Sequence, residues 1–247
     1  MDNNLRKFWR KYFSLHWKFG LFLVVLLCVP RFFLVLQANE QGNYGVIGMV
    51  MFLSAIVPFI FLNRNGTKNI GLRTPKSIFT LLLALLAGIV FSVVLYFIGD
   101  LLYGGSYENW YEYIGKSYAI PENITADAKR TMFIIMAITG MIFSPIGEEL
   151  FFRGIVHFSF AKSVGDRKAS FIDSAAFAIT HISHFGLVFI AGGWDFYFVP
   201  TLLWVSSMFL VSLLFFKMKQ LTGSIWGAVL CHSGFNLGMI YSIFYLL

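Results

Sequence analysis

The chain has 247 residues, of which 58% are hydrophobic, 19% aromatic and 13% charged, and its net charge is +7. A soluble domain usually carries about twice that charged fraction, and here apolar runs recur along the whole chain, so the composition excludes an ordinary soluble protein. The positive charge does not indicate a nucleic-acid partner, because the basic residues lie between the apolar runs.

Apolar segments long enough to cross a bilayer follow one another along the chain, since a core of about 30 Å requires roughly 20 helical residues. The seven segments are 19–37, 45–62, 78–102, 131–161, 170–191, 196–216 and 221–246. The first follows five basic residues but lacks a small-residue cleavage site, so we interpret it as a retained helix rather than a signal peptide. These segments predict an all-α fold, a polytopic integral membrane helical bundle forming a single domain over residues 1–247.

The basic residues between the segments predict the orientation. Fourteen of the nineteen Lys and Arg residues lie in segments 1–18, 63–77, 162–169 and 217–220, and three lie in the alternate segments. Because cytoplasmic loops are enriched in Lys and Arg, this alternation places the N-terminus in the cytoplasm. Membrane lipid is then a partner, with some attraction to anionic inner-leaflet lipids.

The predicted external loop, residues 105–130, is rich in Tyr and Trp. Such a segment is typical of one lying on the membrane surface or of an aromatic belt. A role in gating substrate access is the alternative.

Ionisable residues inside three of the segments require an explanation, because each costs at least about 2.5–3.5 kcal/mol near the bilayer centre. The fourth segment contains SPIGEELFFRGIVH, the fifth FAITHISH and the seventh CHSGFN. Glu149 and Arg153 are four residues apart and share a helix face, which favours an ion pair. The side chain of Glu148 projects about 100° away from that of Glu149 around the helix axis and is expected to contact a different partner.

The depth of these side chains indicates one common site. At 1.5 Å per residue, Glu148 lies roughly 21 Å from the cytoplasmic end of its segment, and His181 and His232 lie roughly 18 Å from theirs. Asn236 lies roughly 24 Å in. Polar residues that do not share a site are not expected at a similar membrane depth in three helices.

The residue types favour chemistry on a water molecule. Desolvation makes a buried glutamate a stronger base, so Glu148 is the candidate general base for attack on a carbonyl. His232 and Asn236 are candidates for stabilising the oxyanion or fixing the water, and His181 for sharing the water or assisting proton transfer. Glu149 and Arg153 are expected to support these groups, and Pro145 to loosen the helix beside them.

Other polar residues have simpler interpretations. His184 and His157 lack a motif partner and are expected to form ordinary interhelical hydrogen bonds. Asp173 is expected to be solvated near a segment end, and Arg31 to snorkel or pair with an acidic group, with no predicted role. The sequence has no HExxH motif and no paired intramembrane aspartates.

The three polar segments resemble the CAAX protease and bacteriocin-processing family, also called CPBP or Abi, whose pattern is EExxxR, FxxxH and HxxxN. The matching residues are Glu148, Glu149, Arg153, Phe177, His181, His232 and Asn236. The resemblance implies a motif-bearing protease core over 148–236 and a bundle of about eight helices, against the seven segments found here. It also implies a glutamate-type intramembrane endopeptidase in which Glu148 and His181 activate water and His232 and Asn236 stabilise the oxyanion. Glu149, Arg153 and Phe177 then support the site, and no cofactor is required.

Three functions remain open. The favoured one is metal-independent hydrolysis of a membrane-associated peptide, lipidated or of the bacteriocin or signal type, in a bacterial cytoplasmic membrane. The second is a metal-dependent membrane hydrolase, because Glu and His also bind Zn²⁺ or Mn²⁺. The third is a non-enzymatic bacteriocin-immunity or scaffold protein.

Overall fold

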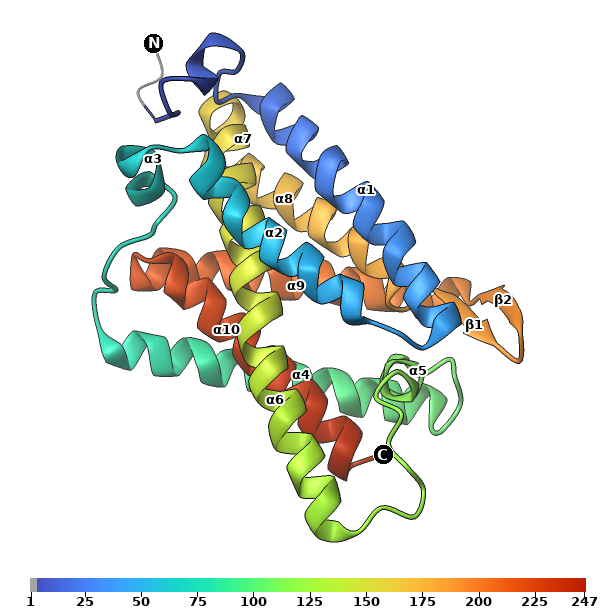
Figure 1. The fold of residues 1–247 in the computed structure, drawn as a ribbon. Coiled ribbons are helices and arrows are strands. Elements are labelled where there is room, and N and C mark those ends of the chain that lie inside the picture. The colour runs from blue at the N-terminus through green and yellow to red at the C-terminus, as the bar shows by residue number, and fades with distance from the viewer. Residues whose placement is uncertain (1–3) are drawn as a thin grey trace.

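The computed structural model describes residues 4–247 and is almost entirely helical (Figure 1). The long helices are α1 (Trp17–Gln41), α2 (Gly45–Phe61), α4 (Ile78–Tyr103), α6 (Ala126–Glu149), α8 (Asp166–Thr180), α9 (Phe198–Thr222) and α10 (Ile225–Tyr245). The shorter ones are η1 (Trp9–Lys11), α3 (Arg64–Asn69), α5 (Trp110–Lys116), η2 (Leu150–Val156), α7 (His157–Val164) and η3 (His181–Ser183). One hairpin pairs β1 (Leu187–Ile190) with β2 (Gly193–Phe196).

Within residues 4–247, five helices are long and apolar enough to span a membrane. They are α1, α4, α9, α10 and a continuous 39-residue helix made of α6, η2 and α7. The α2 helix is apolar but has only 17 residues. Large apolar side chains such as Leu101 and Phe79 on α4 are exposed at 85% and 72%, as expected of a surface in contact with lipid. The chain is an integral membrane protein, although five candidate spans are fewer than the predicted seven or eight.

The predicted fifth span, 170–191, is wrong. Helix α8 ends at Thr180, and the apolar run after it forms strand β1. The two-residue turn Ala191–Gly192 has positive φ angles of 50° and 82° at its two positions, as a type I′ hairpin turn requires. An apolar run of this length is compatible with either a helix or a strand, and the turn that follows it favours the strand.

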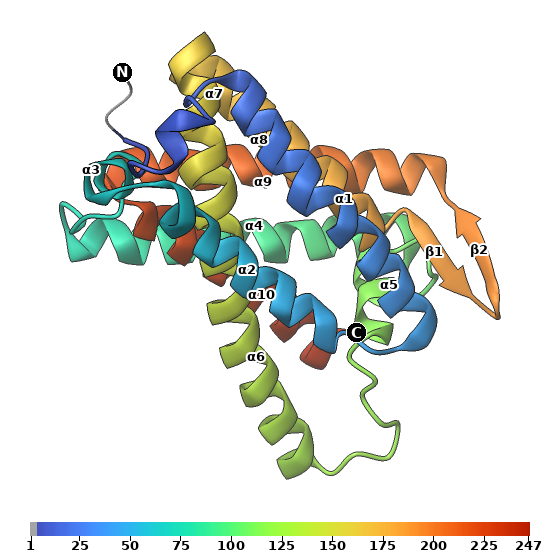
Figure 2. The ribbon, with the colours of Figure 1, turned by 45° about the horizontal axis from the view of Figure 1, so that its top comes forward.

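The interface between α4 and α10 depends on small residues. A Cβ atom at Gly88 would lie 1.9 Å from the carbonyl oxygen of Cys231, and one at Gly234 would lie 2.1 Å from that of Leu85. Only glycine permits such an approach of two helix backbones. Helix α6 crosses this pair and also packs against α2 (Figures 1 and 2).

The segment 105–130 is attached to the rest of the protein through a short buried helix. It contains α5, whose Trp110 and Tyr111 are fully buried. Tyr111 donates a hydrogen bond from its hydroxyl to the backbone oxygen of Ser92 at 2.6 Å, and the ring of Trp110 packs against Trp204. Asn109, Trp110, Tyr111 and Tyr113 are therefore part of the protein interior, whereas most of the segment after α5 is exposed.

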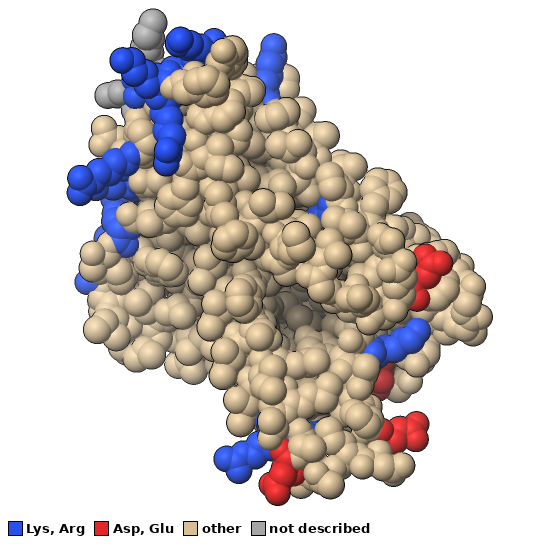
Figure 3. All heavy atoms as spheres, viewed as in Figure 1, with Lys and Arg blue, Asp and Glu red and all other residues tan. Residues whose placement is uncertain are grey.

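Charge is segregated between the two ends of the molecule. Lys and Arg side chains gather near the N-terminal segment and α3, whereas Asp and Glu side chains gather at the opposite end (Figure 3). Between the two ends the visible surface is almost free of charge, as a bilayer requires.

Candidate active site

A cavity of about 440 Å³ lies among α2, α6, α9 and α10, with η3 and the end of α5 completing its wall. Figure 3 shows a hollow in the middle of the visible face, where α2, α6 and α5 meet in Figure 1. Most of the lining is apolar, with polar side chains from the three sequence motifs at its inner end. Glu148, Phe177, His181, His232 and Asn236 all line this one cavity.

The two oxygens of Glu148, in the last turn of α6, have different surroundings. Oε1 accepts hydrogen bonds from Arg31 Nη2 at 2.9 Å and from Ser144 Oγ at 2.7 Å. Oε2 is buried, and no donor within the described chain bonds to it. It lies 3.9 Å from Nε2 of His181, which is too long for a hydrogen bond.

The backbone determines which nitrogen of His181 faces Glu148 as an acceptor. Nδ1 lies 2.7 Å from the carbonyl oxygen of Phe177. A carbonyl oxygen only accepts, so the neutral imidazole carries its proton on Nδ1 and leaves a lone pair on Nε2. Trp204 donates to the carbonyl oxygen of His181 at 3.1 Å and holds this turn in place. Two acceptors, Glu148 Oε2 and His181 Nε2, therefore face each other.

Glu149 has entirely different partners. Arg153 donates to both of its carboxylate oxygens through Nε and Nη2, and Nδ1 of His232 lies 2.8 Å from Oε1. Glu149 and Arg153 are both fully buried, so their charges compensate each other away from solvent. The guanidinium group also lies over the ring of Phe177, 4.5 Å from its centroid. This cluster fixes the orientation of His232 and leaves its Nε2 as the free ring nitrogen.

Asn236 lies one helical turn after His232. Its Nδ2 donates one hydrogen to the carbonyl oxygen of Gly140 at 2.9 Å. An amide group carries two hydrogens, so one N–H of Asn236 remains for another acceptor in the cavity.

The helix geometry changes next to the two glutamates. Residues of η2 form a π-helix, and all seven are buried. Lys219 of α9 donates from its ammonium group to the backbone oxygen of Arg153. Single π-helical turns are rare and concentrate at functional sites. Here the wider turn follows the pair Glu148–Glu149, whose side chains bond to α1 on one side and to α10 on the other.

Several residues of the site were not predicted from the sequence. Arg31, Ser144 and His184 surround Glu148, and the ring of Phe215 stacks on His232 at 4.6 Å with an angle of 12° between the planes. Tyr118 lines the cavity from the segment that follows α5, and burial raises the pKa of its phenol to about 12. None of the five belongs to a recognisable motif, and only Arg31 and His184, as ionisable residues inside apolar runs, gave a signal.

The interpretation of Asp173 changes. Asp173 is fully buried rather than solvated, and it lies 2.7 Å from Nδ1 of His157. His184 makes a contact to another helix as expected, with its Nε2 3.4 Å from Arg31 Nη2 on α1, and its side chain also lines the cavity.

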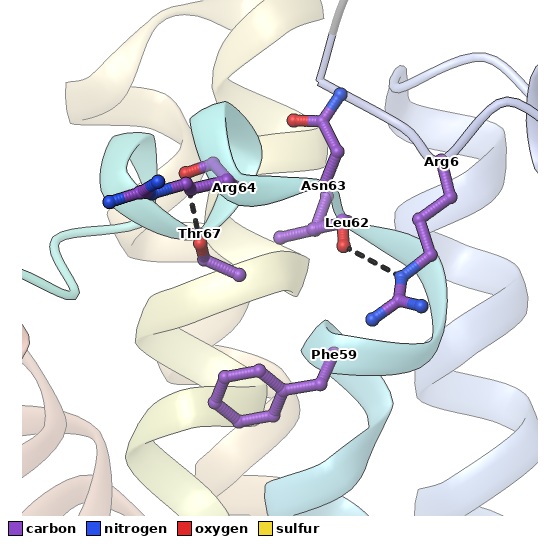
Figure 4. Close-up of a pocket in the computed structure, with 6 residues that line it drawn as sticks. All are labelled: Arg6, Phe59, Leu62, Asn63, Arg64 and Thr67. Carbon is purple, nitrogen blue, oxygen red and sulfur yellow. Dashed lines mark hydrogen bonds between the residues drawn. The ribbon is translucent and has the colours of Figure 1, made fainter.

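A second hollow, of about 430 Å³, lies at the basic end between the N-terminal segment and α3 (Figure 4). Arg6 donates from Nε to the backbone oxygen of Leu62 at 3.2 Å, and the guanidinium groups of Arg6 and Arg64 point away from each other. No motif residue lines it. Across residues 4–247, no three His, Cys, Asp or Glu side chains are grouped so as to hold a metal ion.

Comparison with known families decides the relationship. Residues 130–238 match the type II CAAX prenyl endopeptidase Rce1-like family. This match supports the CAAX protease family for the segment from α6 to α10. The segment contains every motif residue, and the family description implies a protease acting within the membrane. No curated protein and no solved structure matches the chain.

Proposed function

We propose that the protein is a glutamate-type intramembrane endopeptidase, and that Glu148 and His181 together activate its water. The observation that carries this proposal is the pair of acceptors, Oε2 of Glu148 and Nε2 of His181, held 3.9 Å apart at the inner end of a cavity. Oε2 is buried and needs a donor, because an unsatisfied buried polar group costs about 1–3 kcal/mol. One water molecule satisfies both acceptors by donating one hydrogen to each.

The proposed reaction conserves every proton. Glu148 removes a proton from the water as its oxygen attacks the carbonyl carbon of the peptide. The resulting oxyanion accepts the free N–H of Asn236. His232, whose ring is oriented by the contact of its Nδ1 with Glu149, donates to the same oxyanion from Nε2 when that nitrogen carries a proton. Collapse of the intermediate breaks the C–N bond, and the proton held by Glu148 passes to the leaving amine.

The substrate we propose is a membrane-associated peptide. The cavity is lined mostly by apolar side chains, and the hollow in Figure 3 lies on the uncharged face between the basic and acidic ends. A lipidated peptide can approach such an opening without leaving the bilayer. The family description refers to prenylated CAAX substrates, which makes a prenylated peptide the first candidate, with bacteriocin-type or signal-type peptides next.

Peptide hydrolysis by the purified protein tests the proposal. Wild type, Glu148→Gln and His181→Ala are incubated in detergent with farnesylated and unmodified peptides, with and without a chelator, and the products are identified by mass spectrometry. We expect wild type alone to cleave, with no effect of the chelator. Glu148→Gln keeps the shape of the side chain and removes the base, so its activity is expected to fall by at least about 1,000-fold.

Two other results would each support a different function. Chelator sensitivity with stoichiometric bound metal would support the metal-dependent hydrolase. A folded wild type that cleaves none of the peptides, and a Glu148→Gln variant that retains biological function, would support a bacteriocin-immunity or scaffold role.

A further inference from the structure

Arg31 is an arginine in the middle of an apolar helix. It lies on α1, directly after Pro30 and outside the family segment 130–238, and it is 5% exposed. A charged residue in this position costs at least about 2.5–3.5 kcal/mol and requires a specific partner. Its partner is Glu148, 117 positions away in the chain.

The guanidinium group also faces the cavity. Nη2 donates to Glu148 Oε1 at 2.9 Å and lies 3.4 Å from His184 Nε2. Nε is buried and has no acceptor among residues 4–247. Arg31 therefore makes one ion pair, with the residue proposed as the base, and keeps part of its hydrogen-bonding capacity unused.

The charges around Glu148 show what this pair does. The positive charge of Arg153 is compensated by its ion pair with Glu149, so Arg153 does not compensate the charge of Glu148. Four other titratable groups face Glu148. They are His181 in η3, His184 directly after η3, His232 on α10 and Cys28 on α1. A neutral imidazole or thiol compensates no charge, so Arg31 is the one permanent cation beside Glu148 in the part of the chain that the structure describes.

We propose that Arg31 is a positioning residue that holds Glu148 in the ionised form and keeps its Oε2 directed at the water. This role rests on the proposed function of Glu148 as the base. Without the guanidinium group, a carboxylate in this cavity has no compensating charge and takes up a proton, because burial disfavours the charged form. Ser144 and Arg31 both bind Oε1, so Oε2 is left to face His181.

The first test measures the protonation of Glu148 and needs no substrate. Infrared difference spectra of wild type, Arg31→Lys and Arg31→Gln are recorded as a function of pH, and the Glu148 band is assigned by its loss in the corresponding Glu148→Gln variants. In wild type and Arg31→Lys we expect a carboxylate at neutral pH. In Arg31→Gln we expect the band of the protonated acid, which converts to carboxylate only at higher pH. Identical titration in all three proteins would overturn the proposal, whether or not the protein hydrolyses peptides.

The second test uses the pH dependence of hydrolysis. Activity requires ionised Glu148, so it is lost as the pH falls, which gives the acid limb of the pH–activity profile. Without the guanidinium group of Arg31, Glu148 ionises only at a higher pH. The acid limb of Arg31→Gln is therefore expected to move to higher pH. At a pH below the acid limbs of both proteins, each pH unit by which the limb is displaced lowers the rate of Arg31→Gln about tenfold relative to wild type. The activity of the variant recovers in alkaline solution. Arg31→Lys is expected to keep the limb near that of wild type.

Val35→Ala is the matched structural control, because Val35 is fully buried one helical turn after Arg31 on the same helix. It disturbs the packing of α1 without changing charge, so its acid limb should coincide with that of wild type. An Arg31→Gln variant with an unmoved limb would show that Arg31 only anchors α1, while the loss of activity in Glu148→Gln would still support the proposed function.

Discussion

Glu148 and Glu149 are neighbours in the sequence, but their side chains enter separate networks. Glu149 is closed within the Arg153–His232 cluster, whereas Glu148 keeps one oxygen free toward the cavity. The separation follows from the rotation of about 100° per residue in a helix. One carboxylate can therefore stabilise the structure while its neighbour remains available for chemistry.

Glu149→Gln is expected to destabilise the protein strongly. It leaves Arg153 as an uncompensated buried charge, a change that typically costs about 3–5 kcal/mol. Unfolding measured by denaturant titration in micelles checks this, with Glu149→Gln/Arg153→Met as the matched double variant. The double variant should recover part of the loss, and a double variant no more stable than the single one would contradict the role of the ion pair.

Asn236→Ala is expected to affect catalysis rather than folding. Removing one oxyanion donor typically lowers kcat about 100- to 1,000-fold. The KM should change little, because the interaction forms in the transition state. Steady-state kinetics on a cleavable peptide measures both constants, and an increase in KM at unchanged kcat would assign Asn236 to substrate binding instead.

The polar motif residues of the site could be predicted from the sequence because each is a polar group at an unfavourable depth, whereas Phe177 was found only through the family resemblance. Arg31 is likewise a charged group at an unfavourable depth. Its partner could not be identified from the sequence, because two residues 117 positions apart show no recognisable spacing. Phe215 gave no signal, because a phenylalanine stacked on a histidine is indistinguishable in the sequence from one facing lipid. The catalytic roles of Glu148, His181, His232 and Asn236 stay predictions.

At the scale of helices, the glycine-lined interface between α4 and α10 determines where the third motif lies. His232 is preceded by Cys231, whose backbone oxygen occupies the space left open by Gly88. The position of α10 along α4 is therefore fixed by backbone contact next to a motif residue.

Gly234→Ala tests this interface. The added Cβ meets the oxygen of Leu85, so the helices must separate, and we expect the free energy of unfolding to fall by about 1–3 kcal/mol. Gly48→Ala in α2 is the matched control, because a Cβ there meets nothing within 4 Å. Alanine has a higher helix propensity than glycine, so Gly48→Ala should leave the free energy of unfolding unchanged or raise it by up to about 1 kcal/mol. Equal effects in the two variants would show that close packing is not what makes Gly234 necessary.

Each end of the long apolar helices α1, α4 and α10 lies within four residues of its predicted position, because continuous hydropathy is a strong signal; α9 extends six residues beyond its predicted end. The elements missed were short or depended on tertiary contacts. Helix α5 has seven residues, and its buried aromatic side chains look the same in the sequence as those of an interfacial belt. Strand β1 is an apolar run whose conformation is determined by the turn that follows it.

For the whole molecule, the segregation of charge predicts the orientation. Single cysteines are introduced by Glu122→Cys and Lys168→Cys, both at exposed positions, in a variant whose Cys28 and Cys231 are replaced by alanine. We expect a membrane-impermeant maleimide to label Glu122→Cys in intact cells and Lys168→Cys only after permeabilisation, as the positive-inside rule requires. The reverse pattern would place the N-terminus outside.

The long-range pairing of Arg31 with Glu148 also affects how the protein is made. A ribosome adding about 5–20 residues per second needs roughly 6 to 23 s to synthesise the 117 positions between the two. During that interval Arg31 lacks Glu148, the carboxylate that it binds in the folded protein. Helix α1 therefore completes its contact with the site only after α6 has been synthesised, so assembly of the site proceeds in an order different from that of synthesis.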